Sequence, residues 1–136
     1  MLSFSVNDVK AFMGKLLKSE LFDAFDLHSF AIHSFAVFEM HKHPAGVPPA
    51  WAQARVYAFD IIKGSKAPSY MKVVLARADG DDLLFLNVLF EDGGIVLTSG
   101  MSQKSFSMDK SKYQAWNEFI VDFLAKNEIE YTNNLE

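Results

Sequence analysis

Three extended segments, separated by two glycine-containing turns, constrain the fold of this chain more than any other feature. The segments are residues 70–77, 83–90 and 95–99, and the turns are Asp79-Gly80-Asp81 and Asp92-Gly93-Gly94. Glycine and aspartate readily adopt the backbone dihedrals of tight hairpin turns, and the segments between them are rich in residues that suit strands. The pattern predicts an antiparallel meander, so the rest of the chain must pack around a sheet.

Two amphipathic helices are expected, one before the meander and one after it. Ser5 and Asp8 form an S-x-x-D pattern, a variant of the capping box, which predicts that the first helix begins there. The last helix is expected to follow Asp109 and to end near Asn127, and residues 133–136 are expected to fray. Apolar residues recur at spacings of three and four along both helices: Val6, Val9, Phe12, Met13, Leu16 and Leu17 in the first, and Tyr113, Trp116, Phe119, Ile120, Phe123 and Leu124 in the last.

Residues 30–41 alternate with a period of two, which predicts a strand. One face is apolar, and the other carries His33, Glu39 and His41 but also Phe35 and Val37. A strand that is apolar on its second face needs cover from a helix or from another molecule, and exposed apolar patches commonly mark interaction sites. We therefore expect Phe35 and Val37 to form an interaction surface.

Residues 43–49 contain three prolines and a glycine and are expected to form a loop. The segment 51–62 that follows fits two structures. The helical alternative rests on apolar residues at helical spacing and on Gly64, which would stop the helix. The strand alternative rests on residues that would share one face and suit strands: Arg55, Tyr57, Phe59 and Ile61.

The expected order of elements is helix, strand, helix, three or four strands, and helix. The fourth strand of that group would be residues 101–106. This order lacks the regular alternation of a doubly wound sheet, so the expected class is α+β. Three helices would pack on a mainly antiparallel sheet of four to five strands. With 136 residues, half of them apolar, the chain has the size of one domain, and a single domain over residues 1–136 is expected.

Composition excludes several classes of function. The formal net charge of −4 disfavours nucleic-acid binding, which relies on lysine and arginine at phosphates. The absence of cysteine excludes disulfides and cysteine-ligated zinc and suits a reducing compartment. No apolar stretch approaches the roughly 20 residues that a membrane crossing needs. We expect a cytoplasmic protein without a membrane span, and the 13 phenylalanines make a homo-oligomer plausible.

All four histidines lie in one short stretch, at positions 28, 33, 41 and 43. If the strand continues, His33, His41 and His43 point to the same face, where imidazoles could bind a metal ion. Pro44 ends that strand, however, and a bare His-x-His pair is not a diagnostic metal motif. The sequence therefore favours no metal site and leaves these three residues as weak candidates.

A second candidate site lies at the end of segment 51–62. Arg55, Lys63 and Lys66 flank a glycine-containing loop whose exposed amides, beside these cations, could hold a phosphate or a carboxylate. The loop lacks the pattern of a nucleotide phosphate loop, and Lys63 would also complement the negative end of a helix. The three residues are therefore an anion-binding hypothesis.

Four strings of the sequence are similar to a known family: residues 8–17, Phe22-Asp23-Ala24-Phe25, residues 61–68, and Asp109-Lys110 through Trp116 to Phe123-Leu124. On these strings the chain resembles a family of small bacterial proteins catalogued as a domain of unknown function, and the resemblance extends over nearly its full length. That resemblance implies no activity, cofactor or catalytic residue. It also implies a small hydroxyl residue in place of His33 and an acidic residue in place of His41, so this chain departs from the pattern at both.

The sequence contains no nucleophile elbow, phosphate loop or cofactor fingerprint, so we identify no catalytic residue and no cofactor. The leading expectation is a non-catalytic module that binds a protein partner or a second copy of itself. The alternative is a protein that binds or hydrolyses a small phosphorylated or acidic ligand.

Overall fold

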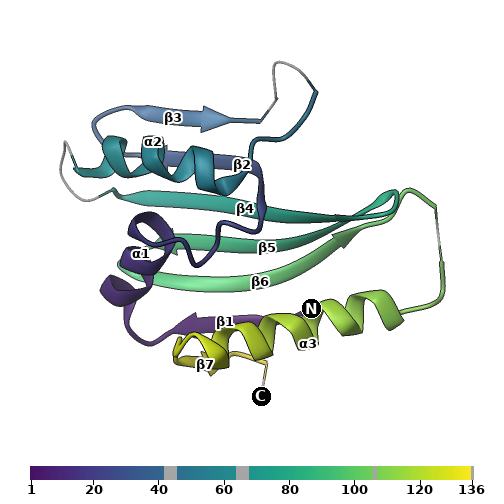
Figure 1. The fold of residues 1–136 in the computed structure, drawn as a ribbon. Coiled ribbons are helices and arrows are strands. Elements are labelled where there is room, and N and C mark those ends of the chain that lie inside the picture. Colours follow the sequence, from purple (N-terminus) through teal and green to yellow (C-terminus); the bar gives the residue numbers. More distant parts are fainter. Residues whose placement is uncertain (42–45, 64–67, 106, 136) are drawn as a thin grey trace.

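The computed structural model describes residues 1–41, 46–63, 68–105 and 107–135, which form one antiparallel sheet and three helices (Figure 1). The sheet has seven strands in the order β3-β2-β4-β5-β6-β1-β7. In chain order the elements are β1 (Ser3–Val6), α1 (Val9–Lys18), β2 (Asp26–His33), β3 (Val37–Met40), α2 (Trp51–Lys63), β4 (Tyr70–Asp79), β5 (Asp82–Glu91), β6 (Gly94–Ser102), α3 (Ser111–Lys126) and β7 (Tyr131–Asn133).

The predicted meander is confirmed as β4, β5 and β6, which form the centre of the sheet. Its two turns have the predicted backbone geometry, because Gly80 and Gly93 adopt φ angles of 62° and 80°. Such positive angles are accessible to glycine at little steric cost. These turns set the register in which the three longest strands pair.

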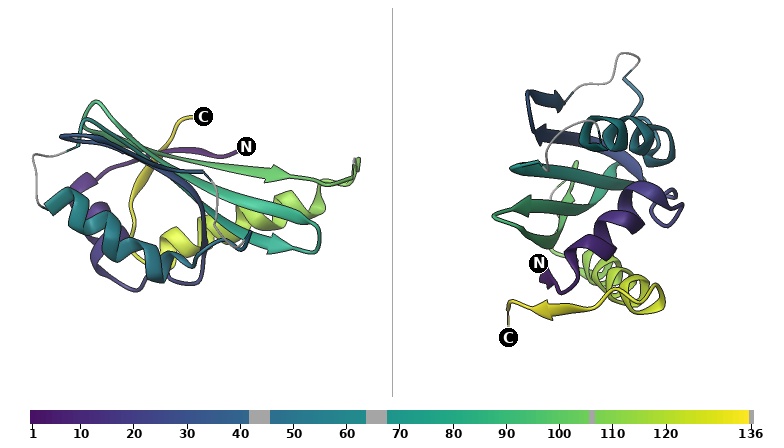
Figure 2. Two further views of the ribbon diagram at one scale, coloured as in Figure 1. Left: turned by 90° about the horizontal axis from the view of Figure 1, so that it is seen from above. Right: turned by 90° about the vertical axis from the view of Figure 1, so that its left-hand side faces the viewer.

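All three helices lie on one face of the sheet, and in the described part of the chain no helix lies on the other face (Figure 2). On the helical face, strand residues such as Met71, Val73 and Leu75 are fully buried. On the opposite face, which we call the open face, Lys72 and Ala78 of β4 are exposed, while Val74 and Ala76 between them are buried. A sheet with one covered and one solvated face is usual for antiparallel strands.

Both tryptophans attach helices to their surroundings from within this core. The Trp51 indole donates to the carbonyl of Leu16 at 3.0 Å, which joins α2 to α1. The Trp116 indole donates to the carbonyl of Phe85 at 2.9 Å, which joins α3 to β5. The two rings combine apolar burial with a satisfied polar group, as buried tryptophan requires.

The α+β class and the three helices are confirmed, and segment 51–62 is helical, which decides between the two alternatives. The predicted count of four to five strands is wrong, because β1, β3 and β7 raise it to seven. Residues 101 and 102 belong to the end of β6, so a separate strand there is not found in the described residues. Among those residues no helix combines the length and the apolar character of a membrane span.

The first helix begins later than predicted. Ser5 lies in β1, and Asp8 is the N-cap residue, because its carboxylate accepts from the backbone N–H of Ala11 at 3.0 Å. The apolar residues of the four-residue strand β1 continue the helical spacing of α1. The sequence pattern therefore predicts one element where the structure has two.

The predicted strand over residues 30–41 is a hairpin. Strand β2 ends at His33, a turn of three residues follows, and β3 begins at Val37, which pairs with His33. The turn contains Phe35 and no glycine or proline. Because the turn has three residues, His33 before it and Val37 after it point to the same face of the sheet. The alternation of faces therefore continues through the turn, as it would in one long strand.

The predicted fraying of the last residues is wrong for Asn133 and Asn134. Asn133 pairs with Phe4 in the ladder between β7 and β1. The backbone N–H of Asn134 donates to the carbonyl of Ser3 at 2.9 Å. A three-residue strand has too little periodicity to be recognised locally, and its partner lies at the other end of the chain.

Candidate functional site

The turn of the β2–β3 hairpin exposes the two large apolar side chains that the sequence predicts to form an interaction surface. Phe35 is 77% exposed and Val37 is 62% exposed. The Phe35 ring contacts the ring of Phe38 in an edge-on arrangement with centroids 5.5 Å apart. Val37 opens β3, which is the terminal strand of the sheet. The two apolar side chains therefore lie beside a sheet edge.

A hollow of about 390 Å³ opens on the open face next to this hairpin. Ala31 of β2 pairs with Glu39 of β3 on one side and with Lys72 of β4 on the other. Directly paired residues point to the same face of a sheet, so Glu39 and Lys72 flank the small side chain of Ala31. The residues that line the hollow are Ser29, Phe30, Ala31, His33, Glu39, His41, Tyr70 and Lys72.

Two of the candidate histidines meet at this hollow. The Nε2 atom of His41 lies 3.1 Å from Glu39 Oε2, and Nε2 of His33 lies 3.9 Å from Glu39 Oε1. His28 lies elsewhere, with its ring centroid 5.0 Å from that of Phe85. His43 lies outside the described residues. Within the described residues, no group of three metal-ligating side chains could hold a metal ion.

Two of the three residues predicted to bind an anion, Arg55 and Lys63, lie in α2 within the described part of the chain. Arg55 forms an ion pair with Asp23, with Nε 2.8 Å from Oδ1 and Nη2 3.3 Å from Oδ2. The hydrogen bond to Asp23 is the main cause that raises the pKa of Arg55. Lys63 lies 3.1 Å from Asp60 one turn earlier in α2, and Lys66 is outside the described residues. Arg55 and Lys63 therefore each contact a carboxylate of the chain itself.

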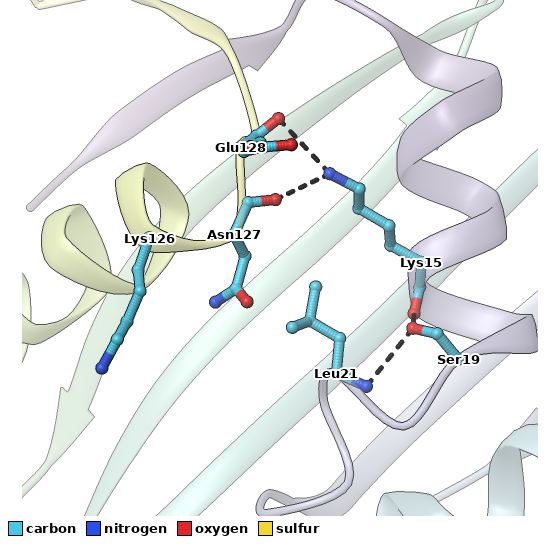
Figure 3. Close-up of a pocket in the computed structure, with 6 residues that line it drawn as sticks. All are labelled: Lys15, Ser19, Leu21, Lys126, Asn127 and Glu128. Carbon is cyan, nitrogen blue, oxygen red and sulfur yellow. Dashed lines mark hydrogen bonds between the residues drawn. The ribbon is translucent and has the colours of Figure 1, made fainter.

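A second hollow, of about 450 Å³, lies between the C-terminal ends of α1 and α3 (Figure 3). Lys15 extends from α1 toward α3, and its Nζ donates to the carbonyls of Asn127 at 2.7 Å and of Glu128 at 3.3 Å. These carbonyls lie at the C-terminal end of α3, where the carbonyl groups of a helix have no N–H donor within the helix itself. The ammonium of Lys15 thus has a structural role, because it binds these two carbonyls. Lys126 of α3 also lines the hollow.

A third hollow, of about 400 Å³, lies where the β4–β5 turn meets the start of α3. The Nζ atom of Lys112 donates to Asp82 Oδ2 at 2.9 Å, and the backbone N–H of Lys104 donates to Asp82 Oδ1 at 3.2 Å. These two hydrogen bonds lower the pKa of Asp82, chiefly through Lys112. The pKa of Lys112 is raised in turn, first by its hydrogen bond to Asp82. The pair links two elements and is an internal connection of the fold.

The hollow on the open face brings together side chains of different chemistry: two imidazoles, a carboxylate, an ammonium, a phenol and a hydroxyl. The sequence placed Glu39 on one face with His33 and His41, and the structure brings these three side chains together. Lys72 and Tyr70 were missed, because they join the site only through the pairing of β2 with β4. That pairing connects segments separated by α2, and no local pattern reveals it.

Residues 77–132 match a family of unknown function, DUF5721. No curated protein and no solved structure matches the chain significantly. The match covers less than half of the chain, from the end of β4 to β7, and it contains Asp82 and Lys112 but none of the residues that line the hollow on the open face. The resemblance expected over nearly the full length is therefore shown for this part of the chain, as a similarity to a family without an assigned function.

Proposed function

We propose that this protein is a self-associating interaction module in which β3 pairs with β3 of a second copy. The observation that carries the proposal is the exposure of Phe35 and Val37 beside the terminal strand of the sheet. Within the described residues, β3 pairs on one side with β2. The outer side of such a strand presents unpaired backbone N–H and C=O groups, which another strand can satisfy.

The composition of β3 favours pairing over protection. Many proteins guard an edge strand with lysine or proline, and the residues of β3 (Val37–Met40) include neither. The opposite edge differs, because the ring of Tyr131 in β7 stacks on Phe4 of its own chain, with centroids 4.0 Å apart. The apolar side chain at that edge is therefore already used within the chain.

A second copy is the partner that this edge fits. Two identical strands can pair antiparallel about a twofold axis, which is the commonest symmetry of protein oligomers. A twofold antiparallel pairing centred on Phe38 sets Glu39 of each copy opposite Val37 of the other, so no like charges directly oppose each other. The two sheets would then form one continuous sheet.

Sedimentation velocity across a wide range of protein concentration tests the proposal. We expect wild-type protein to form a dimer, and the Val37→Lys variant to weaken the dimer by at least about tenfold in Kd, since a lysine on an edge strand opposes strand addition. The control is Val56→Lys, the same change at an exposed valine of α2. A wild-type protein that stays monomeric, or a dimer that survives both Val37→Lys and Phe35→Ser, would contradict the proposal.

A further inference from the structure

The hollow on the open face has walls of opposite charge. Glu39 and Lys72 stand on either side of Ala31 in one row of paired residues. Their Cα atoms are separated by two strand spacings, about 9.6 Å. Because the side chain of Ala31 is a single methyl group, the space between the carboxylate and the ammonium stays open. The row therefore forms a short channel with a negative wall, an apolar floor and a positive wall.

The two ends of this channel carry polar side chains. His33 and Tyr70 close one end, and their rings lie 4.8 Å apart. His41 and Ser29 line the other end. Imidazole, phenol and hydroxyl groups can each donate or accept a hydrogen bond. The volume of about 390 Å³ is within the range of small-molecule pockets, so the channel can hold a compact polar molecule.

Both charged walls retain bonding capacity. Within the described residues, no carboxylate lies within 4.0 Å of the Lys72 ammonium, since Lys72 forms none of the ion pairs found there. Glu39 approaches the two imidazoles through one oxygen each, at 3.1 Å and 3.9 Å. A carboxylate offers about four lone-pair positions, so Glu39 can accept further donors.

This arrangement selects against ligands with a single charge. An anion placed at Lys72 would also meet the carboxylate of Glu39, and a cation placed at Glu39 would also meet the ammonium of Lys72. A molecule that carries both charges a few ångströms apart satisfies both walls. We infer that the hollow is a binding site for a free α-amino acid, whose ammonium binds Glu39 and whose carboxylate binds Lys72.

The side chain of the amino acid would point out of the channel, toward solvent or the apolar part of the open face. The Glu39 side chain is 46% exposed and Lys72 is also exposed, and ion pairs in contact with water contribute little. The expected Kd is therefore in the range of about 1 mM, and selectivity lies in the paired charges more than in the side chain. The inference does not depend on self-association, because the channel opens on the face of the sheet and not at the outer edge of β3.

Chemical-shift perturbation of the full chain, titrated separately with glycine, L-alanine and L-leucine, tests this inference. We expect saturable shifts at the backbone amides around Ala31, Glu39 and Lys72. N-acetylated amino acids lack the ammonium and amino-acid amides lack the carboxylate, so each should bind at least tenfold more weakly. Acetylated forms that bind as tightly as the free amino acids would identify a simple anion site and overturn the inference. The absence of saturable shifts for all three amino acids would overturn it as well.

Substitutions separate the channel from the rest of the open face. Ala31→Leu fills the floor without changing any charge and should abolish binding, whereas Ala78→Leu, the same change at an exposed position of β4, should leave binding intact. Lys72→Gln removes the positive wall at an exposed position and should also abolish binding if Ala31→Leu fails to fold. Binding that persists in Lys72→Gln, or in a folded Ala31→Leu, would show that amino acids bind elsewhere.

Discussion

At the scale of single residues, Trp51 both fills space in the core and satisfies a backbone carbonyl group. Its ring is fully buried, and its indole N–H satisfies the carbonyl of Leu16. Leu16 lies in the last turn of α1, where carbonyls have no donor within the helix. The neighbouring carbonyl of Lys15 is satisfied by the hydroxyl of Ser19, at 2.5 Å. The end of α1 is thus capped by side chains from outside its own ladder.

We predict that Trp51→Phe lowers the free energy of unfolding by about 2–3 kcal/mol, because it leaves a buried carbonyl unsatisfied and opens a cavity. Urea denaturation measures the change. The control is Tyr57→Phe, at a side chain on the same helix that is 68% exposed, which should stay within about 0.5 kcal/mol of wild type. Equal effects of the two changes would show that the indole bond contributes nothing.

At the scale of elements, the ion pair between Asp82 and Lys112 connects the β4–β5 turn to α3, and it makes stability depend on pH. The hydrogen bonds from Lys112 and Lys104 lower the pKa of Asp82 in the folded chain. The carboxyl therefore stabilises the fold above its ordinary pKa, near 4, and that contribution is lost as the pH falls through the lower pKa of the folded state. Asp109 adds to the same trend, because the backbone N–H of Ser111 lowers its pKa.

We predict that Asp82→Asn flattens the acid side of the stability profile, measured as the urea midpoint at pH values from about 6 down to about 2. Lys112→Met should flatten it in the same direction, because the hydrogen bond from Lys112 is the first cause of the shift. Asp109 remains in both variants, so the flattening should be partial. Acid profiles that match wild type in both variants would contradict this account.

The elements also show what a sequence can predict and why. The meander, α1, α2 and α3 follow from local periodicity and from turn chemistry at Gly80 and Gly93. For the β2–β3 hairpin the sequence pattern predicts one strand, because apolar and polar residues keep alternating through its three-residue turn. Strands β1 and β7 have four and three residues, too few for a pattern, and they exist because of partners far away in the chain.

The same distinction applies to the candidate site. The shared face of His33, Glu39 and His41 is a local property of alternation, and it was predictable. The opposing wall, Lys72, joins the site through the register of β2 with β4, which β3 and α2 separate in sequence. Charge and residue type alone could not indicate that Lys72 faces Glu39 across Ala31.

At the scale of the whole molecule, stability should decline from the centre of the sheet toward its edges. Strands β4 and β5 have ten residues each and pair along both sides, whereas β3 and β7 are short and terminal. We predict that hydrogen exchange, followed by mass spectrometry, is slowest in β4 and β5 and fastest in β3 and β7, since opening an edge breaks fewer contacts.

The same hydrogen-exchange measurement, repeated at several protein concentrations, also tests the pairing of β3 with a second copy. If β3 pairs with a second copy, its amides should become more protected as the concentration rises, while those of β7 should not change. Slow exchange in β7 relative to β4 would contradict the expected order of stability. Protection of β3 that is independent of concentration would contradict the pairing and leave that order in place for the other strands.

The position of β1 in the sheet has a consequence for synthesis. Ser3 of this first strand pairs with Thr98 of β6, so its neighbour is among the later parts of the chain to be made. At a translation rate of about 5–20 residues per second, β1 waits roughly 5–20 s before that neighbour leaves the ribosome. During this interval the buried face of β1, with Phe4 and Val6, has no sheet to cover it. The nascent chain therefore carries an early apolar segment that chaperones can bind before folding completes.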